Sequence, residues 1–211
     1  MKRALSILFL ALIVLTSVAY GQKKQEKKVR KAFEGYKTAI LNDKGEKAVD
    51  FVDSRTVSYY GRMAEQTRTA DSLTLESMNI LDKLMVFSIR QRATREEILS
   101  FDGRGLLIYA IESGMVGKNS VAGNTIGEVE VDADFAKGQF IANGKPAPFY
   151  FHFYKEDGQW KVDLTSLFPI ATTAFTTVAQ QSGKGENEFL FGLLELANGK
   201  RPGREVWQTV E

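Results

Sequence analysis

The stretch FYFHFYKEDGQWKVDL at residues 149–164 predicts two antiparallel β-strands joined by a tight turn. Asp157-Gly158 is a two-residue hairpin signal, because both residues tolerate the left-handed backbone that such a turn needs. Apolar residues stand at every second position on either side of it: Phe149, Phe151, Phe153, Trp160, Val162 and Leu164. A period of two is typical of strands with one buried face. The hairpin therefore buries an aromatic face.

The same period continues outward, toward the N-terminus. Apolar and acidic residues alternate as in a half-buried strand: Val129, Val131, Ala133 and Phe135 against Glu128, Glu130, Asp132 and Asp134. Phe140 and Ala142 belong to the next strand, and Asn143-Gly144 is a second turn signal. Together these segments predict a four-stranded antiparallel meander.

Helical spacing dominates the sequence before the sheet. A first helix of about 18 residues is predicted by Val29, Phe33, Tyr36 and Ile40. Asp43 to Glu46 and Thr94 to Glu97 have the pattern of capping boxes. Ser72 could cap one long helix whose apolar stripe reaches Ile89. Residues Thr56 to Tyr60 suit a strand or a helix, and the spacing of Val57, Tyr60 and Ala64 favours a helix.

Two further helices are expected after the last strand. Ser166 precedes a helix with Pro169 in its first turn, where proline is tolerated. This helix should bury four apolar side chains: Ile170, Ala174, Phe175 and Val178. A last helix runs from Glu186 to Ala197, and Val206 and Trp207 of the tail should pack onto the body.

The N-terminus has the three parts of a cleavable secretory signal peptide. Lys2 and Arg3 precede the apolar run from Leu5 to Leu15, and Ala19-Tyr20-Gly21 offers small residues for a signal peptidase. The run is shorter than the roughly 20 residues that span a bilayer. We expect a signal peptide at residues 1–21, no membrane span after its cleavage, and a protein exported to the periplasm or secreted.

The rest of the chain is expected to form one α+β domain over residues 22–211. Its helical part is predicted at residues 22–119, its sheet at 120–164, and its C-terminal helices and tail at 165–211. The signal contains two of the 28 basic residues and none of the 26 acidic ones, so the mature chain is formally neutral. A neutral chain argues against nucleic acid as a partner, since that binding depends on neutralising phosphates.

The hairpin residues Lys155 to Val162, KEDGQWKV, resemble the late hairpin of the NTF2-like superfamily, which includes the SnoaL-like proteins. The order of helices first and meander second is similar as well. The resemblance implies a curled sheet packed with helices as a cone. It also implies a function among those of isomerases, dehydratases, transport factors and ligand-binding or partner-binding domains. The extra helices before the sheet and after the last strand depart from the family pattern.

Few residues point to chemistry. His152 should face Asp163 across the hairpin, which makes an acid-base pair on paper, but the strand alternation places both on the wet face away from the aromatic core. The acidic side chains at 128–134 stand about 7 Å apart along one strand face, too far apart to share one calcium ion unaided. The chain has no cysteine and a single histidine, so we expect no metal site and no cofactor.

The aromatic supply could instead line a pocket for an apolar ligand. The candidates are Phe149, Phe151, Phe153, Trp160 and Phe168. The favoured function is therefore an exported, non-catalytic binding module for a small apolar ligand or a protein partner. An isomerase or dehydratase of the NTF2-like kind is the first alternative. A structural subunit of an envelope assembly is the second, and the oligomeric state stays open.

Overall fold

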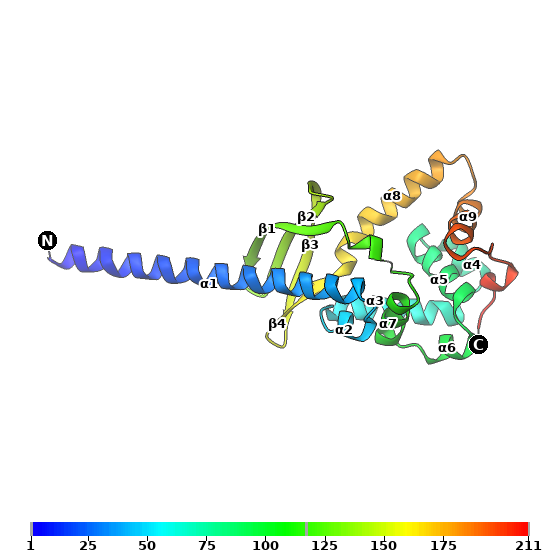
Figure 1. Cartoon of the computed structure of the whole chain (residues 1–211), viewed down its shortest axis with the longest axis horizontal. Helices are drawn as coiled ribbons and strands as arrows, with labels where there is room; N and C mark the ends of the chain where they lie inside the picture. The colour runs from blue at the N-terminus through cyan, green and yellow to red at the C-terminus, as the bar shows by residue number, and fades with distance from the viewer. Residues whose placement is uncertain (1, 117, 211) are drawn as a thin grey trace.

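A four-stranded antiparallel meander forms one part of the molecule (Figure 1). The computed structural model describes residues 2–116 and 118–210, except for the side chains of residues 2–20 and 120. The strands follow one another in the order β1 (Asn124–Asp132), β2 (Phe135–Ala142), β3 (Lys145–Glu156) and β4 (Gln159–Asp163). Both predicted turns are present, with positive φ at Asn143 and Gly144 and at Asp157 and Gly158. The predicted α+β fold with a meander of this size is thus confirmed.

The register of the late hairpin is the predicted one. His152 pairs with Asp163, Tyr154 with Lys161 and Glu156 with Gln159. Phe151 and Phe153 are buried on the opposite face of the sheet. A two-residue turn fixes which residues pair, and the pairing fixes which side chains share a face.

The first hairpin differs from its prediction. The chain turns at Ala133, whose φ is 51°, and at Asp134, so β1 ends at Asp132 and Phe135 begins β2. Phe135 lies on the outer face, with ring centroids 5.3 Å from His152 and 5.2 Å from Tyr154. The prediction of one strand through Phe135 is wrong, because an alternating pattern can pass through a two-residue turn without a break.

The first helix lies against the sheet, and most of the other helices lie beyond one end of it (Figure 1). The helices before the sheet are α1 (Lys2–Leu41), α2 (Gly45–Val49), α3 (Ser54–Thr69), α4 (Ser72–Ser77), α5 (Ile80–Arg92), α6 (Arg95–Ser100) and α7 (Gly103–Glu112). A 3-10 turn, η1 (Lys118–Ser120), precedes β1, and after β4 come η2 (Leu164–Leu167), α8 (Phe168–Gln181), α9 (Glu186–Asn198) and η3 (Arg204–Trp207). Thr56 to Tyr60 are helical, within α3.

Helix α1 covers the aromatic face of the sheet (Figure 1). The rings of Phe33 and Phe151 lie 5.1 Å apart, and Trp160 Nε1 donates to Gln25 Oε1 at 3.0 Å. The predicted signal peptide spans residues 1–21, and its side chains at positions 1–20 lie outside the described part of the structure. Among the described residues, no helix is both long and apolar enough to cross a membrane.

Two predicted helix starts are wrong, whereas the capping box at Thr94 and Glu97 is confirmed. Asp43 has a φ of 52° and its backbone N–H bonds back to Ile40, so it ends α1 and does not cap α2. The expected long helix from Ser72 is two helices, because Asn79 accepts bonds from the N–H groups of the next turn and starts α5 anew. A side chain that caps a new helix interrupts the one before it.

Helix α8 is far less buried than its sequence predicts. Ala179 is its one buried residue, and Val178 is 52% exposed. The expected burial of Ile170, Ala174 and Val178 is therefore wrong. The helix projects beside α9 and packs one edge against α5, which leaves the rest of its apolar surface open (Figure 1).

The core consists of two hydrophobic clusters. The larger one joins the aromatic face of the sheet to α1, α2, α3 and α7, around Phe33 and Phe153. The smaller one joins α4, α5 and α9 to the C-terminal tail, around Phe87, Leu190 and Val206. Val206 is fully buried, and Trp207 packs on this cluster as predicted.

Candidate functional site

The His152–Asp163 pair does not form an acid-base dyad. Asp163 is 5% exposed, and its Oδ1 accepts bonds from the N–H and the hydroxyl of Thr165 at 2.9 and 2.5 Å. The expectation of a wet face is wrong for Asp163, because η2 folds back over the end of the hairpin. His152 is half-buried, and its ring contacts Phe135. The carboxylate therefore caps η2 and holds the chain where it leaves the sheet.

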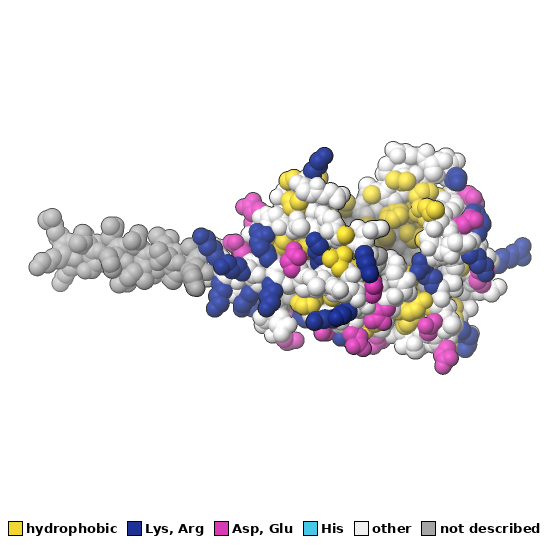
Figure 2. All heavy atoms as spheres, viewed as in Figure 1, with side chains coloured by type: hydrophobic (Ala, Val, Ile, Leu, Met, Phe, Trp, Pro, Cys, Tyr) yellow, Lys and Arg dark blue, Asp and Glu magenta, His cyan; other side chains and the backbone are white. Residues whose placement is uncertain are grey.

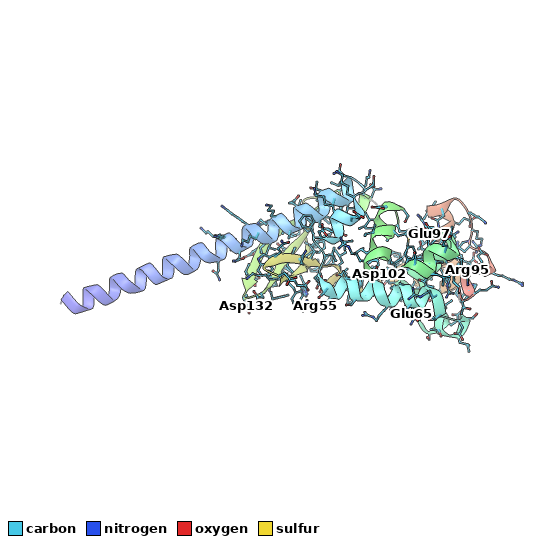
Figure 3. All side chains as sticks on the ribbon, turned by 90° about the horizontal axis from the view of Figure 1, so that it is seen from below. Arg55, Glu65, Arg95, Glu97, Asp102 and Asp132 are labelled. Carbon is cyan, nitrogen blue, oxygen red and sulfur yellow. The ribbon has the colours of Figure 1, made fainter. Side chains whose placement is uncertain are left out.

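The same outer face carries a stacked arginine. Arg55, at the start of α3, places its guanidinium carbon 3.4 Å from the centre of the Tyr154 ring. Figure 3 shows Arg55 where α3 adjoins the sheet. Its Nη1 lies 3.1 Å from the buried carboxylate of Asp53. These contacts join α3 to the sheet and account for the charge of Arg55.

The acidic side chains of β1 are paired or scattered. Glu130 lies 3.1 Å from Lys137 Nζ, and Asp134 lies 3.2 Å from Lys155 Nζ. Within the described residues, no group of three or more His, Asp or Glu side chains could hold a metal ion. Ion pairs on an exposed strand face contribute at most about 1 kcal/mol each, so this face is an ordinary solvated surface.

The five aromatic residues proposed as a pocket lining lie in different surroundings. Phe151, Phe153 and Trp160 are buried in the larger cluster. Phe149 stacks on Phe140, with ring centroids 5.1 Å apart, and Phe168 packs 4.6 Å from Tyr59. That these residues line a ligand pocket stays a prediction, and the apolar cavity described next has other walls.

An apolar cavity of about 370 Å³ lies where the two hydrophobic clusters meet. Its walls come from α3, α5, α7, residues 114–116, α8 and α9. Six apolar residues represent these walls: Leu84, Met85, Leu106, Ala110, Phe175 and Leu193. Figure 2 shows hydrophobic side chains in the hollow between α8 and the rest of the helical region. This volume falls in the range of small-molecule sites.

The cavity exists because α8 does not close onto α5. One edge of α8 contacts α5 and α9. Among the side chains of α8, Phe175 is the one that lines the cavity. The apolar stripe of α5 is wider than one packing partner covers, so the apolar residues that are left uncovered line the cavity. The width of this stripe, to which Leu84, Met85 and Ile89 contribute, is the sequence feature that could have indicated the cavity.

The ionisable groups at the cavity are a tyrosine and an arginine. Tyr60 is buried, and desolvation raises the pKa of its hydroxyl to about 12. Arg92 lines one end of the cavity and donates from Nη1 to the carbonyl of Ser113 at 3.0 Å. A guanidinium stays protonated in proteins. Neither group can exchange a proton readily near neutral pH.

Compared with known protein families, curated proteins and solved structures, the chain shows no significant match. The similarity of Lys155 to Val162 to the NTF2-like hairpin therefore stays a prediction.

Proposed function

We propose that this chain is an exported, non-catalytic binding module that holds a small apolar ligand in the cavity between α5, α7, α8 and α9. The observation that carries the proposal is a cavity of about 370 Å³ whose walls are mostly apolar. Burial of apolar surface contributes about 25 cal/mol per Å², so such walls favour an apolar occupant. The N-terminal pattern from Lys2 to Gly21 supports export.

Helix α8 is the wall that could move to admit a ligand. It has no charged residue, and Ala179 is its one buried residue. Elements with few buried contacts open at the lowest free energy. Gly183 follows α8 with a φ of 68°, a conformation that glycine adopts without strain. We therefore place ligand entry beside α8.

The direct test fills the cavity. Leu193 on α9 lines it, and Leu193→Trp should obstruct it. Leu196 on the same helix is 85% exposed, so Leu196→Trp is a matched control outside the cavity. Binding is followed by the fluorescence of N-phenylnaphthylamine, a neutral apolar probe.

We expect Leu193→Trp to weaken binding of the probe about tenfold or more, because an overfilled cavity must displace its walls. Leu196→Trp should bind as the parent does. Equal affinity of the parent and Leu193→Trp would place the probe elsewhere and refute the site. Native mass spectrometry of protein from its natural source should also show a bound small molecule.

A further inference from the structure

A polar pocket lies next to the apolar cavity and shares two lining residues with it. It measures about 370 Å³ and is lined by Gln91, Arg92, Ala197, Asn198 and Lys200. Arg92 and Ala197 also line the apolar cavity, so the two hollows meet along these residues. A ligand that occupied both would have an apolar part among the helices and a polar part at the end of α5 and α9.

The walls at this junction are positively charged. Arg92 and Lys200 are the charged residues of the two linings, and no acidic side chain lines either hollow. In the described part of the chain, Arg92 forms no ion pair and donates one hydrogen bond, to Ser113. Within the described part of the chain, the charge of Arg92 is compensated by a helix end, the C-cap carbonyl of α7 at Ser113, and by no acidic side chain in ion-pair contact.

Arg92 also has an unsatisfied donor. Its Nε is buried and has no acceptor among the described residues, and the Ser113 hydroxyl and Oδ1 of Asn198, which lines the polar pocket, are likewise buried and unpaired there. Buried polar groups in proteins nearly always have partners, so an unpaired one calls for a functional explanation. The Nη2 of Arg92 is not buried and forms no hydrogen bond among the described residues, so it is the donor that can reach a carboxylate in the hollow.

We infer that the ligand is a single-chain carboxylate, with its chain in the apolar cavity and its head group against Arg92 and Lys200. This inference rests on the proposed function and specifies its ligand class. The apolar cavity favours a hydrocarbon chain in the ligand, and the positive residues of the polar pocket favour a negatively charged head group. A cationic or zwitterionic head would meet two cations without a compensating acid.

The test compares ligands that share a chain and differ in the head group. Dodecanoate, dodecanol and dodecylammonium are titrated into the whole chain by calorimetry, below their micelle concentrations. Dodecanoate should bind about tenfold or more tightly than dodecanol, since hydrogen bonds to charged groups are the strong ones. Dodecylammonium should bind more weakly than the alcohol. Each methylene removed from the carboxylate should weaken binding about fourfold.

Variants locate the head group. Arg92→Gln with Lys200→Gln should abolish the preference for the carboxylate and leave dodecanol affinity within about twofold, because the apolar walls are unchanged. Lys200 is exposed, so Lys200→Gln alone should fold as the parent does and lose part of the preference. Arg95→Gln is the control, since Arg95 is an exposed arginine on α6 outside both linings (Figure 3).

The outcomes separate the two proposals. If the parent binds dodecanol as tightly as dodecanoate, or if the double variant keeps the preference, the carboxylate assignment is wrong while the apolar site stands. If neither compound binds, or if Leu193→Trp binds both as the parent does, the proposed function fails as well. A preference for the carboxylate that only the Arg92 and Lys200 variants remove supports both.

Discussion

Arg90 caps the end of a neighbouring helix, and its replacement by methionine should destabilise the protein strongly. Its Nε donates to the carbonyl of Thr67 at 2.8 Å, and its Nη2 donates to Ala70 at 2.7 Å and to Gln66 at 3.3 Å. Its Nη1 donates to the carbonyl of Val206 at 3.0 Å. One side chain on α5 thus joins the last turn of α3 to the C-terminal tail.

The size of the effect follows from what methionine leaves behind. The last carbonyls of a helix have no donor within the helix, and a cation there also interacts favourably with the helix dipole. Burial lowers the pKa of Arg90 to about 10, so it is still charged at neutral pH. Methionine fills the space but leaves buried carbonyls unpaired, at about 1–3 kcal/mol each. The Gln66 carbonyl keeps the N–H of Ala70 as a donor, whereas the carbonyls of Thr67, Ala70 and Val206 lose the guanidinium, so we expect Arg90→Met to cost about 3–5 kcal/mol.

Urea unfolding followed by circular dichroism measures this change. A loss of that size should lower the unfolding midpoint by roughly 1–2 M urea. Arg90→Lys should be intermediate, because one ammonium cannot reach all four carbonyls. Arg95→Met, at an exposed site, should change the free energy of unfolding by less than about 0.5 kcal/mol. A loss below about 1 kcal/mol for Arg90→Met would show that water replaces the guanidinium, and the reasoning would be wrong.

Three further predictions concern other parts of the chain. His152→Gln should lower stability by less than about 1 kcal/mol, whereas Phe151→Ala should lower it by about 3–5 kcal/mol; equal effects in thermal unfolding would contradict the burial described above. Lys83 is 2% exposed and lies 2.7 Å from Glu186, so Glu186→Gln, which leaves a buried ammonium with a weaker partner, should destabilise more than Lys83→Met; the reverse order in urea unfolding would disprove this. Mass spectrometry of extracytoplasmic protein should find Gln22 at the N-terminus, and an intact Met1 would refute cleavage.

The sheet could be predicted because its determinants are local. The Asn143-Gly144 and Asp157-Gly158 turns each fix a pairing, and the pairing together with the period of two fixes which side chains are buried. The same locality explains the error at Ala133, since the turn there has no glycine and interrupts no pattern. The sequence thus predicted the strands better where a turn residue marked their ends.

The helices after the sheet show the opposite case. The apolar stripe of α8 is a correct helix signal, but it does not say whether another element will cover it. Ile170 and Val178 are exposed because no segment in the described structure packs over them. Burial of a helix face depends on its neighbours, and these are separated from α8 by long stretches of chain. The apolar cavity, which has walls from six segments, could not be predicted for the same reason.

Arg90 and Arg92 show why the sequence alone does not predict the candidate site. They are separated by one residue on α5, and at 3.6 residues per turn their side chains point in nearly opposite directions. Arg90 faces α3 and the tail, where four carbonyls satisfy it. Arg92 faces the cavity, where its Nε has no acceptor among the described residues. The sequence of residues 90–92 predicts neither arrangement, because each depends on which distant segments the fold places beside the arginine. Of these two like charges on one helix, Arg92 is the one that lines both hollows.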